Sequence, residues 1–493
     1  PGGVIITDKN ITIDLNGNTF TVSNGASTNN RNFKVNGSSV VTIKNGTMVA
    51  AGNYSSGAYG TLRTENTANV TLEDVKLYNY RGNGLNVKAL SGTTVTINDT
   101  EIYSQYGGGI ESAGGIIELT NVKVEQKQGG DWNTCAEEMI NFTSAPDGSL
   151  RAYIIEPGKV GSLVANGVAA SWGDYDFSAE KWNTFTLNAW KIGDDIYGVS
   201  TGATEPRGCV YFNKRILEEA GIDWNTIYDM QAEGTWTWSA WEELLKKTTI
   251  DSDNDGVIDI YGVSGSGDDM YVLATFGNGG SFFDYDAEGK LQPTMNSNET
   301  IEALNWGKTI QANYWMHTPE GANWDWYKQA WKEGQFAFYV YQTYGGYNDN
   351  SEMADMEDEW GCVAFPKPDK EGAKYLHVAS ENTTLIPNVY TAEEIAKIAF
   401  FVDLWTNPTP GYDDEDAWIG NKYNYTDERA VDETYAMLRQ GEHAVDNKVV
   451  YLGTQNDILG ASLLWGLAGG DVNALIEAGM PAWQAACDTF NAK

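Results

Sequence analysis

The first 127 residues alternate apolar and polar positions in short stretches that recur along the chain. Each stretch runs apolar, polar, apolar, any residue, Asn or Asp, two variable residues and a final apolar residue. Four copies occupy 41–48, 70–77, 95–102 and 117–124, and a longer, looser copy occupies 11–20. Period-two alternation predicts a short strand with one buried face. The Asn or Asp tolerates the left-handed geometry of a bend toward a second strand.

Stacking explains why these units repeat. The copies start at intervals of 30, 29, 25 and 22 residues, and a unit this small does not bury its own apolar face. Successive units bury that face by stacking, which predicts a right-handed parallel β-helix over 1–127. Second strands are predicted at 32–35, 60–63 and 84–87. The segment resembles β-helical polysaccharide lyases and hydrolases in pattern only, because its few basic residues are scattered and no acid cluster has a partner base. We expect a spacer or a passive glycan contact here.

The pattern changes to apolar spacings of three and four from about residue 139. A helix is predicted at 215–221, ending on a glycine. Ser239 with Glu242, and Thr391 with Glu394, have the spacing of capping boxes at the start of two further helices. Short apolar runs between the helices predict strands. The alternation favours α/β layers in a second domain, 128–493.

Composition narrows the possible functions. The chain has 68 acidic and 32 basic residues, a formal charge of −36, which argues against nucleic-acid binding and against an anionic membrane surface. No run of eighteen apolar residues occurs, and the opening residues lack the charged and apolar regions of a signal peptide. Four widely spaced cysteines without a CxxC pair allow two disulfides in any of three connectivities, but a chain of this length favours buried, unpaired thiols. The 18 Trp and 27 Tyr residues are suited to stacking on sugar rings.

Short motifs in a consistent order carry a family resemblance. They lie at 145–147, 163–167, 196–200, 210–222, 237–238, 251–262, 331–338, 364–368 and 481–491. Among them, Val210-Tyr-Phe-Asn-Lys-Arg-Ile-Leu-Glu-Glu-Ala-Gly-Ile222 resembles "YYNKDLFKEAGI", and Ala364-Phe-Pro-Lys-Pro368 resembles "PFPKGP". In this order, the motifs resemble those of the family 1 extracellular solute-binding proteins, the group that contains maltose- and oligosaccharide-binding proteins.

The resemblance implies both a fold and a function. It implies a two-lobed α/β body of the periplasmic-binding-protein type that binds an oligosaccharide and delivers it to the membrane permease of an ABC importer. Such a protein is extracellular, associated with the cell surface, and not an enzyme. The family opens with a strand, a long helix and a second strand before its Ala-Pro-Asp segment. Here the predicted β-helix replaces that stretch, so we expect an incomplete first lobe.

The resemblance also implies ligand contacts in the cleft between the lobes. Glu205 and Asp269 take the places of carboxylates that accept hydrogen bonds from sugar hydroxyls, and an aromatic residue, Tyr271, follows close behind. Tyr344 stands where the family usually has a stacking Trp. Two tryptophans complete the predicted set, Trp418 and Trp465.

A separate acidic motif predicts a calcium site. Asp251, Asp253 and Asp255 alternate, Gly256 permits a sharp turn, and Val257 offers a carbonyl oxygen, as at the start of an EF-hand loop. Gly262 holds the twelfth position, where that loop has a bidentate Glu, and Asp259 is the expected substitute. The alternative is an acidic turn without a metal.

Catalytic signals are weak. The three histidines are far apart, and the G-x-S-x-G string at 198–202 lies inside a predicted strand with no helix directly after it. Two alternatives to sugar transport stay open. One is a surface scaffold or adhesin that uses both domains structurally, and the other is a polysaccharide lyase or hydrolase centred on the β-helix.

Overall fold

The computed structural model describes residues 4–23, 33–51, 61–79, 87–90, 92–104, 110–113, 115–119, 122–125, 131, 134–346, 353, 356–407, 425 and 427–492. These residues form two compact units, one up to Asp131 and one comprising 134–406 and 425–492, and Asn407 groups with the first. No helix among the described residues is long and apolar enough to cross a bilayer.

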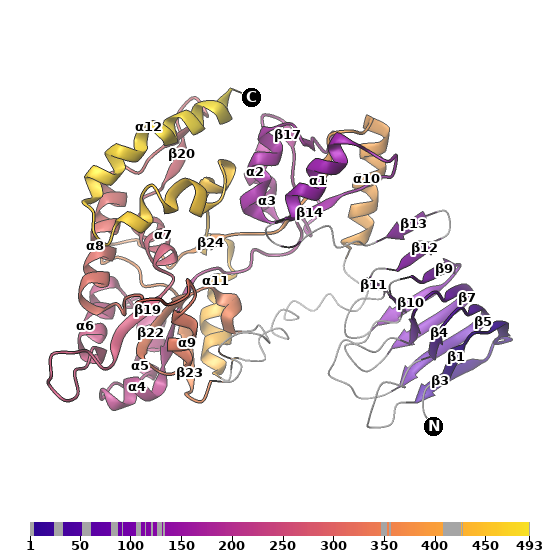
Figure 1. Ribbon diagram of the computed structural model, residues 1–493, viewed down its shortest axis with the longest axis horizontal. Coiled ribbons are helices and arrows are strands. Elements are labelled where there is room, and N and C mark those ends of the chain that lie inside the picture. Colours follow the sequence, from indigo (N-terminus) through magenta and orange to yellow (C-terminus); the bar gives the residue numbers. More distant parts are fainter. Residues whose placement is uncertain are drawn as a thin grey trace. The chain divides into compact units, whose positions relative to one another are not determined.

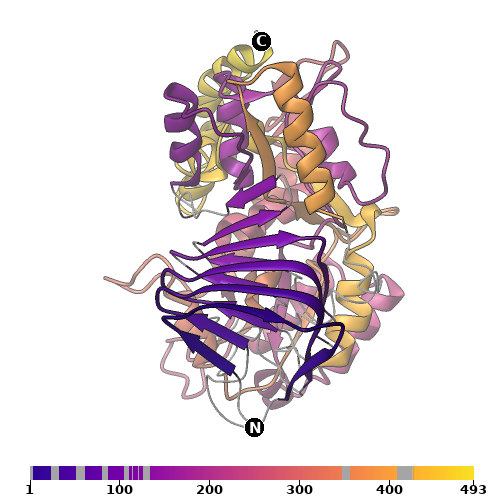
Figure 2. The same ribbon diagram turned by 90° about the vertical axis from the view of Figure 1, so that its right-hand side faces the viewer.

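The first unit consists of two stacked sets of strands (Figures 1 and 2). A five-stranded parallel sheet has the order β1-β4-β6-β8-β11, and an eight-stranded sheet has β13-β12-β9-β7-β5-β2, with β10 beside β7 and β3 beside β5. The eight-stranded sheet is parallel except between β12 and β13. The strands are β1 (Val4–Thr7), β2 (Asn10–Asp14), β3 (Thr19–Ser23), β4 (Phe33–Asn36), β5 (Val40–Ala51), β6 (Leu62–Thr64), β7 (Asn69–Asn79), β8 (Val87–Leu90), β9 (Thr94–Asn98), β10 (Glu101–Ser104), β11 (Ile110–Ala113), β12 (Ile116–Leu119) and β13 (Val122–Glu125).

The sequence repeat sets the register of the larger sheet. Each copy pairs with the next at its first residue, so Val41 lies beside Val70, and Val95 lies beside both Val70 and Ile117. Successive apolar positions form one buried row, since a residue and its neighbours in register share a face. The predicted left-handed bends are confirmed in three copies by the positive φ angles of Asn45 (55°), Asp74 (50°) and Asp99 (46°), whereas residue 121 of the fourth copy lies outside the described residues. The predicted second strands overlap β4, β6 and β8.

The second unit has two lobes, which Figure 1 shows as two groups of elements. The first lobe contains a three-stranded sheet of order β14-β25-β15, and the second a four-stranded sheet of order β19-β22-β18-β23. Elements of the first lobe are α1 (Cys135–Ser144), β14 (Tyr153–Ile155), α2 (Pro157–Ala165), β15 (Ala169–Ala170), α3 (Thr184–Ala189), β16 (Lys191–Ile192), β17 (Asp195–Ile196), β25 (Thr383–Pro387) and α10 (Ala392–Trp405).

The second lobe carries most of the remaining helices. They are α4 (Lys214–Glu219), α5 (Asn225–Glu233), α6 (Trp238–Thr248), α7 (Gly267–Gly277), α8 (Asn298–Tyr314), α9 (Tyr327–Lys332), α11 (Ala436–Leu438) and α12 (Val472–Asn491). Its strands are β18 (Cys209–Asn213), β19 (Tyr261–Gly265), β20 (Phe283–Tyr285), β21 (Leu291–Pro293), β22 (Phe336–Tyr341) and β23 (Trp360–Val363). The described residues also contain 3₁₀-helices, η1 (Thr343–Gly346), η4 (Gly441–His443), η5 (Lys448–Tyr451) and η7 (Leu464–Gly466), and π-helices, η3 (Ala430–Tyr435) and η6 (Asn456–Gly460).

Two parallel strands lie where the chain passes between the lobes. They are β24 (His377–Ala379) and β26 (Ala444–Asp446). β24 leads to β25 of the first lobe, and β26 leads to η5, which packs on α2 of that lobe. The backbone between the lobes runs through this pair, called the hinge strands below because closure of two-lobed proteins bends such connections, and it also crosses between β17 and β18.

Local capping signals predicted the starts of two helices, and one of these predictions is confirmed. The capping box of Thr391 and Glu394 is present at the start of α10, as predicted. The prediction of Ser239 as an N-cap is wrong, because Thr237 caps α6 through the Ala240 backbone N–H. Asp369 accepts hydrogen bonds from the hydroxyls of Thr237 (2.6 Å) and Ser239 (2.5 Å), so a residue far along the chain helps fix where this helix begins.

Candidate functional site

Four segments of the second unit bring together a set of charged and aromatic side chains, the rim cluster. Its members are Glu205, Arg207, Asp269, Tyr344 and Glu381. They lie before β18, at the start of α7, in η1 after β22, and between β24 and β25. The cluster therefore gathers chain ends of the second-lobe sheet beside the hinge strands.

Hydrogen bonds and close contacts join these residues. The Glu205 backbone N–H donates to Glu381 Oε1 at 2.9 Å, and Arg439 pairs with Glu205 Oε1 at 2.6 Å. The Arg207 guanidinium lies 5.6 Å from the centre of the Tyr344 ring, a cation–π contact. Three of the six predicted ligand residues, Glu205, Asp269 and Tyr344, thus belong to one cluster.

Burial raises the pKa of two carboxyl groups in the cluster. Desolvation raises the pKa of Asp269, and hydrogen bonds from Gln342 and Ser266 together with the charge of Arg207 oppose it. Desolvation likewise raises the pKa of Glu381, opposed by the Glu205 N–H and by Arg207. Partly desolvated carboxylates beside a guanidinium form a mixed set of acceptors and donors, which suits a ligand with many hydroxyl groups.

Three tyrosine hydroxyls hydrogen-bond to the backbone next to Tyr344. The carbonyl oxygen of Thr343 accepts hydrogen bonds from the hydroxyls of Tyr211 (2.9 Å), Tyr435 (2.9 Å) and Tyr425 (3.2 Å). All three rings are buried. Because η1 is fixed in this way, the Tyr344 ring, itself partly exposed, starts from a defined position.

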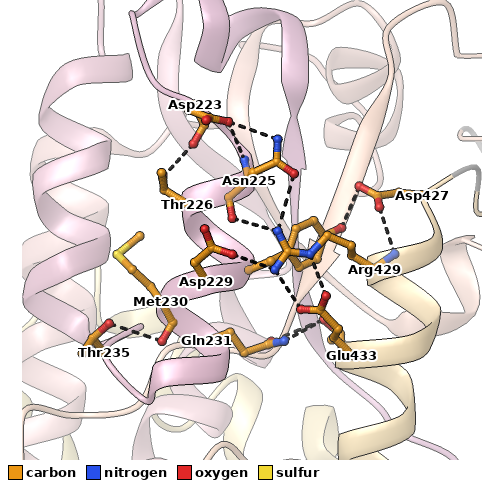
Figure 3. A network of polar contacts seen from close by, with 12 residues as sticks. Asp223, Asn225, Thr226, Asp229, Met230, Gln231, Thr235, Asp427, Arg429 and Glu433 are labelled. Atoms are coloured by element: carbon orange, nitrogen blue, oxygen red, sulfur yellow. Dashed lines mark hydrogen bonds and ion pairs between the residues drawn. The ribbon is translucent and has the colours of Figure 1, made fainter.

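A polar network anchors the segment that supplies Tyr425 and Tyr435 (Figure 3). Arg429 pairs with Glu433 at 2.6 Å and with Asp229 of α5 at 2.8 Å, and it donates to the Asn225 carbonyl oxygen at 3.3 Å. These contacts tie η3 to α5 and so support the tyrosines beneath η1.

The other predicted ligand residues lie elsewhere. Tyr271 is 1% exposed inside the second lobe, where its hydroxyl donates to Gln311 Oε1 at 3.0 Å, so it does not join the rim cluster. Trp465, in η7, is 58% exposed, and its Nε1 donates to Asp268 Oδ2 at 3.0 Å, one residue from Asp269. Trp418 lies outside the described residues.

The acidic loop after α6 brings part of the predicted calcium set together. Carboxylate oxygens of Asp251, Asp253 and Asp259 lie within 4.8 Å of one another. Asp255 is not in this group, and its Oδ1 accepts the Val257 N–H at 2.7 Å instead. The Val257 side chain is 62% exposed. Asn254 (φ 60°) and Gly256 (φ 89°) provide the turn, and three close hard oxygens fit a calcium ion.

Several residues of the candidate site could not be predicted from the sequence. Arg207, Glu381, Arg439 and Asp268 carry no local motif, and their partners lie far away in the chain. A cavity of about 340 Å³ was also not foreseen. It lies apart from the rim cluster, between the end of α7, β20 and β26, and Phe276, Asp284 and Lys448 are among the residues lining it.

The model of the bacterial extracellular solute-binding protein family matches residues 118–410, more than half of the chain. The chain belongs to this family. The match begins inside β12, within the first compact unit. Since family members bind solutes outside the bacterial cell, the prediction of an extracellular binding protein rather than an enzyme agrees with the family.

Solved structures of solute-binding proteins share the two-lobed fold. UgpB from Mycobacterium tuberculosis, in complex with glycerophosphocholine, has a TM-score of 0.52 at 15% identity, covering 76% of this chain and 90% of its own. The cyclic α-maltosyl-1,6-maltose binding protein from Arthrobacter globiformis scores 0.51 at 15% identity, with coverages of 78% and 92%. A solute-binding protein from Thermotoga lettingae bound with α-D-tagatose scores 0.50 at 15% identity, with coverages of 77% and 92%. No curated protein sequence matches this chain.

Proposed function

We propose that this solute-binding protein captures a carbohydrate, an oligosaccharide in particular, and delivers it to the membrane permease of an ABC importer at the cell surface. The rim cluster is the observation that carries this proposal, because it places carboxylates, a guanidinium and a tyrosine ring beside the hinge strands. The sugar-binding proteins from Arthrobacter globiformis and Thermotoga lettingae share the fold and support the choice of solute.

The proposed contacts follow from the chemistry of a sugar ring. Hydroxyl groups of the sugar donate to Glu205, Asp269 and Glu381 and accept from Arg207, while the C–H face of a ring packs on Tyr344. Tyr271 does not contact the ligand itself but supports α7, the helix that carries Asp269. Trp418 remains a contact proposed from the sequence. Hinge movement about β24 and β26 closes the first lobe over the ligand.

Titration calorimetry against a panel of mono- and oligosaccharides tests this function. We expect at least one glycan to bind with measurable heat, and Tyr344→Ala to weaken it by about tenfold or more, the loss of a well-packed aromatic contact. Trp405→Ala is the matched control, because Trp405 is 51% exposed on α10 and is not a member of the rim cluster. If every glycan fails to bind the wild-type protein, the proposal is wrong and the scaffold or adhesin alternative gains.

We also propose that the two sheets of the first unit are faces of one right-handed parallel β-helix spanning 1–127, joined to a body at 128–493. The parallel pairing and the shared register of the repeats support it. Left-handed residues recur at a second corner as well, at Asp8 (φ 52°), Gly37 (65°) and Asn66 (61°). The small first-lobe sheet, whose edge strand β14 leaves Ile154 71% exposed, supports an incomplete first lobe.

For the acidic loop, we propose a calcium ion held by carboxylates of Asp251, Asp253 and Asp259. The Val257 carbonyl and Asp255 stay as further proposed ligands from the EF-hand spacing. The ion would stabilise the turn by neutralising three adjacent carboxylates, and it would take no part in ligand chemistry.

A further inference from the structure

Trp465 is a large aromatic side chain held in place while much of it faces solvent. Its side chain is 58% exposed, yet its Nε1 has a defined partner, Asp268 Oδ2, at 3.0 Å. The two residues come from different elements, η7 and α7, that are 197 residues apart in the chain. An exposed indole without such a bond would sample several rotamers, so the contact restrains a ring that packing holds only in part.

A glycine lies close against the indole, on the side of its Nε1, Cε2 and Cζ2 atoms. Gly460, at the end of η6, lies so close that a Cβ at this position would be 2.8 Å from the ring. The indole therefore rests on backbone along one side. The indole thus contacts backbone at Gly460, its nitrogen is hydrogen-bonded, and more than half of the residue is exposed, which suits a flat surface presented to a ligand.

Asp268 is partly buried, and the indole N–H is its principal donor. Burial raises the pKa of Asp268 to about 6, the neighbouring charge of Asp269 adds to the rise, and the hydrogen bond from Trp465 opposes it. The groups that face it are Asp269 and Tyr271 on its own helix and the indole of η7. Among the described residues, no lysine, arginine or histidine forms an ion pair with Asp268.

We propose that Asp268 is a positioning residue that orients Trp465 as a second stacking surface for the bound sugar, beside the rim cluster. This inference rests on the proposed function. Adding a proton to Asp268 replaces a charge-assisted hydrogen bond with a weaker neutral one, so the indole loses its restraint as Asp268 becomes protonated. The affinity for the sugar then decreases as the pH is lowered and Asp268 becomes protonated.

Two readouts test the proposal on the full chain. The first is the indole N–H resonance of Trp465 in 15N-labelled protein, identified by its loss in Trp465→Phe and followed from pH 7.5 to 4.5. The second is the affinity for the best glycan of the panel at pH 7.5 and pH 5. Asp268→Asn keeps an acceptor oxygen of the same shape but does not titrate.

In wild-type protein, we expect the Trp465 resonance to titrate near pH 6 and the affinity to fall at least threefold between pH 7.5 and 5. In Asp268→Asn, both should be insensitive to pH over this range. The proposal is overturned if the resonance does not titrate, or if the wild-type and Asp268→Asn affinities change equally with pH. If the resonance titrates but the protein binds no glycan, the Asp268–Trp465 contact is supported and the proposed function is wrong.

Discussion

His377 shows how the environment of one residue produces a testable pH response. It lies in the hinge strand β24 with 1% of its surface exposed, and its Nδ1 accepts the Arg207 backbone N–H at 3.3 Å. Burial lowers its pKa to about 4, and the positive charges of His443 and Arg207 contribute to the decrease. The folded protein therefore holds this histidine neutral at pH values where the unfolded chain protonates it.

The sign of the effect follows from proton counting. Between pH 6.5 and about 4, the unfolded state binds more protons at this position, so His377 costs stability as the pH falls. Relative to His377→Gln, wild type should lose about 2 kcal/mol between pH 7.5 and 5. Thermal unfolding of both proteins at the two pH values checks this. Parallel pH profiles would contradict the assignment of a buried neutral ring.

Residues of the proposed site could be predicted from the sequence only where a family motif lies beside them. Glu205, Asp269 and Tyr344 follow recognisable segments of the family. Tyr271 was grouped with Asp269, but residues two apart on a helix face different directions, and here one points into the core. Arg207 and Glu381 escaped notice because their importance comes from contacts about 170 residues distant, which no local pattern encodes.

At the scale of elements, local signals were sufficient where the determining contacts were also local. The repeat predicted the short strands and bends of the first unit, since period-two alternation and a left-handed Asn or Asp depend on neighbouring residues. The α10 capping box lies within four residues. The start of α6 was misplaced because Asp369, which accepts from Thr237 and Ser239, lies about 130 residues away.

The acidic loop after α6 is an element whose order should depend on calcium. Three converging carboxylates repel one another, so an ion bound there stabilises the folded state. With calcium at one hundred times its dissociation constant, the gain should be about 2.7 kcal/mol. Differential scanning calorimetry with calcium or with EDTA measures it.

Matched variants separate this site from general acidity. Asp253→Asn removes one of the three carboxylates and should abolish most of the calcium response. Asp194→Asn, an exposed acid in the turn between β16 and β17, should retain it. An equal response in both variants would rule out the loop as the binding site.

At the scale of the whole molecule, like charges oppose compactness. The formal charge is −36, and folding brings those charges closer together than they are in the unfolded chain. Exposed ion pairs such as Lys397–Glu393 (2.8 Å) act in the opposite direction but contribute little, because water and salt screen them and both side chains lose conformational freedom on pairing. The repulsion among the excess acids should therefore outweigh the attraction within ion pairs and determine how the stability of the folded state depends on salt.

Raising the sodium chloride concentration from 20 mM to 500 mM should raise the unfolding temperature by roughly a few degrees. The Debye length is about 10 Å at 0.1 M and about 3 Å at 1 M, so added salt screens the widely spaced acids most strongly and the short ion pairs least. EDTA in every sample excludes calcium as the cause, and sucrose at equal osmolality separates screening from solute exclusion. A falling unfolding temperature would mean that paired charges, rather than the excess of acids, dominate the electrostatics of this fold.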